Sequence, residues 1–225
     1  MSEQEKHQSY NGARVDLLKL GAYDFSAKTV LDIGCYQGAN ARYLKNAFES
    51  VFYIGMEGNP IAVKNAYPEV DEMHETDLDR VDFSFLEGRQ IDFVILGDVI
   101  EHLKDPELFM AKLAEILHSD SRVSISVPNV QYYETFFLLT VGHFPRRERG
   151  VFDKTHLHFF TNRELRALVE ENYEIMNFSR SFRLVDGHCC ASLNRFNRYA
   201  TPLFRLLAPF FTYQLYYVLQ KRKRA

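Results

Sequence analysis

The sequence predicts an α/β fold built on a mostly parallel sheet, and two observations carry this prediction. Short apolar runs rich in β-branched residues alternate with amphipathic helix patterns between residues 28 and 127. Such runs are typical of strands buried on both faces, and their alternation with helices is typical of a parallel sheet wrapped by helices. The length of 225 residues suits one domain of this class, so we expect residues 1–225 to form a single domain.

The expected elements follow one another along the chain. A helix at residues 12–20 comes first and ends at Gly21. Five strand patterns follow, the third weaker than the rest, at residues 29–33, 51–56, 70–74, 91–96 and 123–127. Helix patterns fill the gaps at residues 40–48, 60–66 and 106–117. Pro106 suits the first turn of the last of these helices.

The alternation of strands and helices ends after residue 127. We expect a helix at 130–139, an irregular loop at 142–160, a helix at 162–172 capped by Thr161 or Asn162, and a strand at 174–183. Loops on a rigid sheet often build specificity. Residues 128–172 are therefore the expected substrate side, between a ligand-binding core at 28–127 and closing strands with a basic tail at 173–225.

The stretch 203–219 is the one place where a membrane segment could lie, because Arg205 is its only charge. Pro209 interrupts this stretch near its middle. We favour a helix packed on the sheet, followed by a last strand at 214–220, over membrane contact. A transmembrane span is not expected, although the basic tail at 221–224 leaves weak contact with a membrane surface open.

Composition and charge exclude several classes of protein. Hydrophobic residues make up 46% and charged residues 25%, which excludes disordered, collagen-like and fibrous chains. Lys plus Arg number 27 and Asp plus Glu 30, and the formal net charge of −3 argues against a long nucleic acid as the main partner. Three cysteines, two of them adjacent at Cys189 and Cys190, cannot form a disulfide framework. The polar start at residues 1–8 has no signal-peptide core, so we expect a cytoplasmic protein.

The first strand runs into a turn that carries a carboxylate and two glycines. The segment 30–38 reads VLDIGCYQG and places Asp32, Gly34 and Gly38 at the carboxyl edge of the sheet, where ligands bind in α/β folds. Glycine permits a tight turn and lets a ligand approach the backbone. Tyr36 replaces the second glycine of the dinucleotide-binding pattern, and an acid beside a pyrophosphate is unfavourable. We therefore expect a cationic ligand rather than a dinucleotide.

Acidic residues also follow the next three strands. Glu57 and Gly58 come after the second strand, where an acid can accept hydrogen bonds from both hydroxyls of a ribose. Asp77, followed by Leu78, comes after the weak third strand and could accept from an exocyclic amine, and Asp98 follows the fourth strand. One such acid is often only a helix cap or a solvated turn. Four acids that each follow a strand of the predicted sheet favour a shared binding site.

These positions resemble motifs I to IV of the class I S-adenosylmethionine-dependent methyltransferases, over residues 14 to 173. The resemblance implies a Rossmann-like fold with a mostly parallel seven-stranded sheet, an antiparallel last strand, and a closing hairpin formed by 174–183 and 214–220. It implies S-adenosyl-L-methionine as the cofactor. Its methionine part would be lined by Asp32, Gly34 and Gly38, its ribose by Glu57, and its adenine by Asp77 and Leu78. Gly58 and Asp98 belong to the same candidate cofactor-binding set, and Tyr36 departs from the family pattern, which usually has glycine there.

A second group of residues lies where the methyl acceptor would bind. Asp98, Glu101 and His102 leave the fourth strand within one turn of each other. His156, paired with His158, lies beyond the fifth strand and can fold over the same edge. A sulfonium methyl group is already activated, so its transfer needs mainly an aligned acceptor and removal of the acceptor's proton. The candidate catalytic residues are therefore His102, His156 and Glu101.

The same residues carry a more distant similarity that bears on a metal. The small-RNA 2′-O-methyltransferases and some ubiquinone-pathway O-methyltransferases have an acid-x-x-Glu-His segment here that binds a divalent metal. The RNA enzymes add a later histidine, so the matching residues are Asp98, Glu101, His102 and, for the later histidine, His156. Mixed carboxylate and imidazole ligands suit Mg²⁺, Mn²⁺ or Zn²⁺. A metal would lower the pKa of a bound sugar hydroxyl. Glu-His is also common at this place in methyltransferases without a metal, so base or positioning roles for the histidines are the favoured alternative.

The segment 126–161 is similar to one subgroup, the bacterial methyltransferases associated with surface polysaccharide and O-antigen synthesis. Residues 150–157, GVFDKTHL, carry the clearest likeness, and Phe144 stands where this group commonly has tryptophan. The likeness implies a small-molecule or glycan partner and a sugar hydroxyl as methyl acceptor. RNA 2′-O-methylation, methylation of another small-molecule hydroxyl, and a non-catalytic scaffold are the alternatives, and the net charge counts against RNA.

A basic loop precedes His156. Its cations are Arg146, Arg147, Arg149 and Lys154. They could hold a phosphate of the acceptor, because guanidinium groups bind phosphate oxygens in pairs. We favour a solvated loop instead, partly balanced by Glu148.

Overall fold

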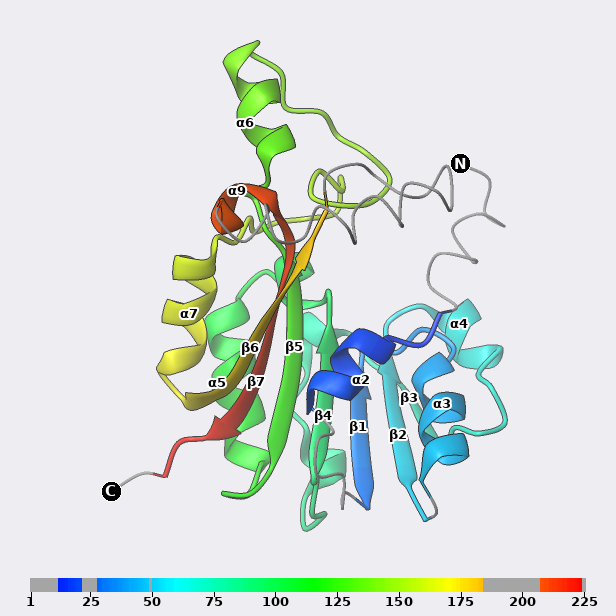
Figure 1. Ribbon diagram of the computed structural model, residues 1–225. Helices are drawn as coiled ribbons and strands as arrows, with labels where there is room; N and C mark the ends of the chain where they lie inside the picture. The colour runs from blue at the N-terminus through cyan, green and yellow to red at the C-terminus, as the bar shows by residue number, and fades with distance from the viewer. Residues whose placement is uncertain (1–11, 22–27, 49, 184–206, 224–225) are drawn as a thin grey trace.

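The computed structural model describes residues 12–21, 28–48, 50–183 and 207–223, and its centre is a seven-stranded sheet of order β3-β2-β1-β4-β5-β7-β6. The strands are β1 (Thr29–Ile33), β2 (Phe52–Glu57), β3 (Glu72–Glu75), β4 (Phe93–Gly97), β5 (Arg122–Pro128), β6 (Tyr173–Phe182) and β7 (Thr212–Lys221). All strand pairings are parallel except those of β7, which is antiparallel to both β5 and β6. The predicted Rossmann-like fold with its antiparallel last strand is confirmed (Figure 1).

Helices cover both faces of the sheet. They are α2 (Val15–Gly21), α3 (Ala39–Ala47), α4 (Pro60–Lys64), α5 (Pro106–Ile116), α6 (Tyr133–Thr140), α7 (Asn162–Glu170) and α9 (Ala208–Phe211), with short 3-10 turns η1 (Leu78–Arg80), η2 (Ser84–Leu86) and η3 (Ile100–His102). Leu31 of β1 packs in one core with Leu113 of α5. Its neighbour Val30 packs in a second core with Leu18 of α2 and Leu44 of α3. Adjacent residues of β1 therefore fill two cores, as the alternation of side chains along a strand requires.

Most element ends lie within one or two residues of the prediction, and two larger differences occur where the chain contacts distant segments. α2 begins three residues late, and the Arg14 amide just before its first residue donates to the side chain of Asn40 in α3 (2.7 Å). α6 also begins three residues late. There the Asn129 amide donates to the carbonyl of Tyr213 (2.9 Å), so the chain after β5 stays beside β7 before it turns into the helix. The 3-10 turns were not predicted.

The start of α7 resolves the choice between two predicted caps. Thr161 accepts at its hydroxyl from the amides of Arg163 and Glu164, and the Glu164 side chain accepts from the Thr161 amide. This capping box satisfies amides that have no partner within the helix. Thr161, not Asn162, is therefore the cap.

The apolar stretch 203–219 is described from residue 207 onward. It holds the short helix α9 followed at once by β7, which begins two residues earlier than predicted. Within the described ranges, no helix is both long enough and apolar enough to cross a membrane. The start of the predicted basic tail is tied to the body, because Lys221 donates to the carbonyl of Leu117 (2.6 Å). Arg205, Cys189 and Cys190 lie outside the described residues.

The carboxyl ends of the parallel strands face the side of the molecule where α6 lies. Figure 1 shows α6 standing out beyond this edge, well away from the sheet. The chain from α6 to α7 returns across the same edge. The substrate side predicted for residues 128–172 thus adjoins the edge that carries the acidic residues.

Candidate active site

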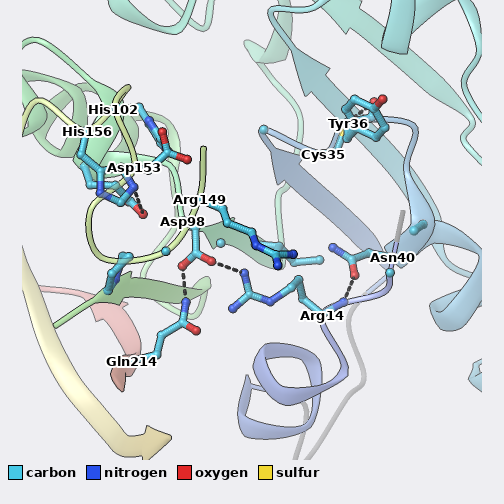
Figure 2. A pocket seen from close by; sticks show the side chains of 18 of the residues that line it. Arg14, Cys35, Tyr36, Asn40, Asp98, His102, Arg149, Asp153, His156 and Gln214 are labelled. Carbon is cyan, nitrogen blue, oxygen red and sulfur yellow. Dashed lines mark hydrogen bonds and ion pairs between the residues drawn. The ribbon is translucent and has the colours of Figure 1, made fainter. Parts of the chain in front are cut away.

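A cavity of about 330 Å³ opens at the carboxyl ends of β1 and β4 (Figure 2). Its walls come from the turn after β1, the start of α3, the end of β4 with η3, and the segment 149–156 that crosses the edge. Among the sequence-predicted site residues, the structure brings together in this cavity Asp32, Gly34, Asp98, Glu101, His102 and His156. The other five, Gly38, Glu57, Gly58, Asp77 and Leu78, are not among its wall residues.

The turn after β1 depends on glycine. Gly34 has φ +71°, and a Cβ there would lie 2.6 Å from the Val99 side chain. Gly38 has φ +83° and precedes the first residue of α3. Tyr36 between them also has positive φ, at 52°, which is costly for a residue with a side chain. The turn therefore keeps the backbone close to the cavity at the expense of local strain.

Asp32 is buried beneath this turn rather than held out toward solvent. One of its oxygens accepts hydrogen bonds from the Tyr53 hydroxyl and from the Asn40 side chain (2.8 Å). Burial raises the pKa of Asp32 to about 6, against the effect of these two donors. The side chain forms part of the cavity wall and carries its charge there at neutral pH.

Glu57 lies at the end of β2, beside the turn. One carboxylate oxygen accepts from the Tyr36 amide (2.9 Å) and the other from the Asn59 amide (2.8 Å). Glu57 is therefore one hydrogen bond away from the cavity, because Tyr36 is a wall residue. Asp77 lies farther along the edge, where it caps η1 by accepting from the Asp79 amide (3.1 Å).

Asp98 is enclosed by three donors that sequence reasoning did not anticipate. It accepts from Arg14 (2.7 Å), from the Ser126 hydroxyl (2.7 Å) and from the side chain of Gln214. Burial opposes the charge on Arg14, but Asp98 and Asp16 outweigh that effect and raise the pKa of the guanidinium. Arg14 precedes Asp98 by 84 positions, so no local sequence pattern signals this pair.

Glu101, His102 and His156 form a separate cluster in the cavity wall. The ligand atoms of the three side chains all lie within 4.8 Å of one another, and the two imidazole rings are 4.7 Å apart. Glu101 is 1% exposed, and neither of its oxygens has a hydrogen-bond partner in the described part of the chain. Burial and the charge of Asp98 hold the pKa of Glu101 well above its usual range.

The segment that carries His156 is fixed to η3 by the backbone. The Glu101 carbonyl accepts from the amides of Leu157 (2.8 Å) and His158 (3.1 Å). Nδ1 of His156 lies 3.3 Å from the Val151 carbonyl, and burial followed by the proximity of His102 lowers the pKa of this imidazole. His156 therefore stays neutral at pH 7 and keeps one nitrogen free to accept a proton.

The donor set of this cluster fits a divalent cation, with one carboxylate and two imidazoles. Asp98, which was predicted to belong to the same set, lies outside this cluster with its oxygens turned to Arg14, Ser126 and Gln214. His158 is also apart from the cluster, since its ring stacks on Phe160 (6.1 Å).

The basic loop is largely neutralised by local contacts. Arg147 pairs with Glu134 (2.6 Å), and Lys154 pairs with Glu148 (2.5 Å). Arg149 belongs to the cavity wall. The solvated-loop interpretation therefore suits Arg147 and Lys154, and Arg149 faces the site.

Comparison with known proteins gives a family and a set of relatives. Residues 6–173 match the family described as "Methyltransferase domain". (S)-Tetrahydroprotoberberine N-methyltransferase of Eschscholzia californica is 28% identical over 97 residues, which cover 42% of this chain and 28% of that protein. A Mycobacterium tuberculosis protein named "Probable S-adenosylmethionine-dependent methyltransferase" is 29% identical over 105 residues, which cover 46% of this chain and 37% of that protein. The matches thus span about a third of the length of these relatives.

Among solved structures, a SAM dependent methyltransferase from Archaeoglobus fulgidus is similar over the whole chain. The TM-score is 0.64 at 17% sequence identity, and the match covers 99% of this chain and 100% of the other. At this level of identity the likeness establishes a shared fold.

Proposed function

This chain belongs to the S-adenosylmethionine-dependent methyltransferase family, and we propose that it transfers a methyl group to a hydroxyl of a sugar or a sugar-containing intermediate. The family membership rests on the match over residues 6–173. The choice of a hydroxyl rests on one observation, the cluster of Glu101, His102 and His156 in the cavity wall. The choice of a sugar rests on the likeness of residues 150–157 to the polysaccharide-associated subgroup.

The cavity suits the proposed cofactor. S-adenosylmethionine supplies a methyl group that is already activated by a positively charged sulfur. Asp32 and Glu101 put carboxyl groups in the wall, and the turn at Gly34 brings the backbone close. Each oxygen of Glu57 accepts one backbone hydrogen bond and has a second lone pair for a ribose hydroxyl.

The chain's own residues must align the acceptor and take its proton. A sugar hydroxyl is a weak acid, so its proton has to leave as the new oxygen–carbon bond forms and the carbon–sulfur bond breaks. Nδ1 of His156 faces the Val151 carbonyl, which leaves Nε2 to accept that proton. In its ionised form the Glu101 carboxyl, 3.9 Å from Nε2, stabilises the imidazolium that results. His102 is oriented by the Thr155 hydroxyl (3.1 Å) and completes the wall beside it.

A metal-assisted reaction is the second candidate, and the unpartnered oxygens of Glu101 favour it. A buried carboxylate without donors is costly, and a divalent cation shared with the two imidazoles would offset that cost. In that case Glu101, His102 and His156 would hold Mg²⁺, Mn²⁺ or Zn²⁺, which would lower the pKa of the acceptor hydroxyl. Activity lost on chelation with EDTA and restored by one of these ions would support the metal, whereas activity untouched by EDTA would support the base.

Labelled cofactor tests the acceptor directly. The purified protein is incubated with radiolabelled S-adenosylmethionine and, separately, with nucleotide sugars, a glycan fraction and an RNA fraction. We expect label in the sugar or glycan. Label in RNA would favour 2′-O-methylation. If none of the three fractions is labelled by a chain that still binds the cofactor, a non-catalytic scaffold would be favoured.

We further propose that the chain is a single cytoplasmic domain whose substrate side is formed by residues 128–172. Three cysteines are too few for a disulfide framework, which suits a reducing compartment. The cavity wall includes residues between 149 and 156, which supports the placement of the substrate side.

A further inference from the structure

The projection formed by α6 and residues 141–144, called the α6 tip below, carries large apolar side chains in the open. The exposed fractions are 56% for Phe136, 55% for Phe137, 55% for Leu139, 76% for Val141 and 41% for Phe144. Figure 1 shows α6 standing beyond the carboxyl edge of the sheet. The rings of Phe136 and Phe137 lie 6.0 and 6.3 Å from the Phe210 ring of α9, at one side of the projection. Apolar side chains gathered in this way on a folded protein mark a binding surface.

The base of the tip is anchored, so the exposure does not come from a loosely held helix. The Tyr133 ring lies 5.9 Å from the rings of both Phe210 and Phe211 at α9. At the far end of the tip, the Phe144 ring contacts the buried ring of Phe152 (5.3 Å), which belongs to the segment that crosses the cavity. The tip is therefore a fixed projection attached to the active-site loop.

The distribution of apolar residues on α6 favours lipid over a protein groove. Residues 136–139 read FFLL, and four consecutive residues of an α-helix point to four different sides. A helix that binds a protein groove presents one apolar stripe. On α6, Leu138 packs toward the body with Tyr132 and Phe152, and Phe136, Phe137 and Leu139 are exposed on the other sides. An exposed apolar face of this width suits lipid that surrounds the projection. The eight residues of α6 extend only about 12 Å, too short to span a bilayer, so the contact is with its surface.

The charges at the base of the tip indicate which kind of membrane surface. Between residues 135 and 147 the only Asp, Glu, Lys or Arg side chains are those of Arg146 and Arg147. Arg147 pairs with Glu134 of α6 (2.6 Å), so Arg146, whose guanidinium donates to the Lys154 carbonyl, supplies the cationic charge at the base of the tip. Acidic lipid headgroups attract such cations next to inserted apolar residues. We infer that the α6 tip docks into the headgroup region of an anionic membrane surface. This inference does not depend on which acceptor is methylated.

The absence of tryptophan from the sequence gives a direct probe of docking. Val141→Trp places the only indole of the chain at the tip, and Ile61→Trp places it on α4, where Ile61 is 62% exposed, as a matched control. On addition of vesicles of equimolar phosphatidylcholine and phosphatidylglycerol, we expect a blue shift of emission for the first variant and none for the second. Phosphatidylcholine vesicles should produce little shift, and added salt should weaken the anionic response.

Flotation of the full chain with the same vesicles tests the contribution of the aromatic residues. The double variant Phe136→Ser, Phe137→Ser should lower the partition coefficient about ten-fold or more. Ile61→Ser with Leu108→Ser removes two equally exposed apolar residues from α4 and α5 and should leave partition unchanged. Circular dichroism verifies that each variant is folded.

Several outcomes would overturn the inference. Failure of the unmodified chain to float with anionic vesicles is one, and equal flotation of the Phe136, Phe137 double variant is another. If the indole of Val141→Trp already emits at a short wavelength before lipid is added, the tip is covered by another part of the same chain or by a second copy. Light scattering distinguishes these two cases by the mass of the particle. Equal binding to both vesicle types would remove the role assigned to anionic headgroups.

Discussion

Two acids three positions apart at the end of β4 have opposite surroundings. Asp98 accepts hydrogen bonds from three side chains, whereas the oxygens of Glu101 are buried with no hydrogen-bond partner among the described residues, one of them 3.9 Å from Nε2 of His156. The sequence places both acids at the edge but does not distinguish them, because the donors to Asp98 come from Arg14, just before α2, and from β5 and β7. The oxygens of Glu101 can therefore bind a proton or a cation, whereas those of Asp98 already accept hydrogen bonds.

The first prediction concerns His156 and its matched control. His156→Ala should lower kcat on the order of 10²-fold while leaving cofactor affinity nearly unchanged, because it removes the acceptor of the proton and not a cofactor contact. His158→Ala should keep kcat within a few-fold, since its ring stacks on Phe160 outside the cluster. Steady-state kinetics with calorimetric titration of cofactor separates the two effects. Equal losses from both variants would remove His156 from the reaction.

The second prediction concerns Asp32 and pH. Its folded pKa of about 6 lies above the ordinary value of about 3.9, so the folded state binds the proton more tightly. Stability from this group is present below about pH 4 and is lost as pH rises to about 6, a change on the order of 3 kcal/mol.

Asp32→Asn should remove the loss of folding stability between about pH 4 and pH 6, because the amide side chain does not ionise. The amide oxygen can take the place of the oxygen that accepts from both Tyr53 and Asn40, so both hydrogen bonds persist. We expect the variant to be more stable than the original chain at neutral pH, with a flatter dependence of urea midpoint on pH, and to bind the cationic cofactor more weakly. A variant less stable at neutral pH would show that the charge of Asp32 stabilises the fold.

At the scale of elements, the strands were predictable where their residues are buried on both faces. β1 matches its predicted bounds because Val30, Leu31 and Ile33 are fully buried and the strand is flanked by a turn. The start of α6 was not predictable, because the Asn129 side chain takes its partners from Pro209 in α9 and Thr212 at the start of β7, 80 and 83 positions later. Local periodicity continued the helix pattern back to residue 130, where the Val130 amide instead donates to the Phe160 carbonyl and residues 130–131 form a turn.

Asn129 also gives the prediction at this scale. Its side chain donates to the carbonyls of Pro209 (3.1 Å) and Thr212 (2.8 Å), and the residue is 1% exposed. Asn129→Ala leaves buried carbonyls without donors and should lower the free energy of unfolding by about 1–3 kcal/mol. Asn65→Ala removes an exposed side-chain bond to the Ile61 carbonyl and should cost less than about 0.5 kcal/mol. Urea unfolding of both variants measures the difference, and equal costs would contradict the role given to Asn129.

At the scale of the whole molecule, the fold brings distant parts of the chain to one edge. The four acids after the strands and the two later histidines were predicted to meet there from the topology of parallel strands alone. Of these, Asp32, Asp98, His102 and His156 share the cavity, together with Gly34 and Glu101, whereas Glu57 and Asp77 are not among its wall residues. The balancing of the basic loop by Glu148 was predicted, whereas the pairing of Arg147 with Glu134 and the contact of Arg14 with Asp98 were not, because both depend on which side chains the packed elements place face to face.

The prediction for the whole molecule is a coupling between cofactor binding and unfolding. A ligand at about 100 times its Kd adds about 2.7 kcal/mol to folding stability, so S-adenosylmethionine should raise the Tm of the chain. Glu57→Ala removes two hydrogen-bond acceptors for the ribose and should weaken binding by tens-fold, which would shrink the rise in Tm. Differential scanning fluorimetry over a cofactor titration measures this. An undiminished rise in the variant would place the ribose away from Glu57.

The position of β7 in the sheet has a consequence for synthesis of the chain. β6 pairs with β7 and not with β5, so when β6 leaves the ribosome it has no place in the sheet until residues 212–221 follow it. During that interval the nascent protein presents two open edges, one on β5 and one on β6, and open edges invite pairing with other chains. A pause in translation between these strands should therefore increase aggregation more than a pause placed after β7.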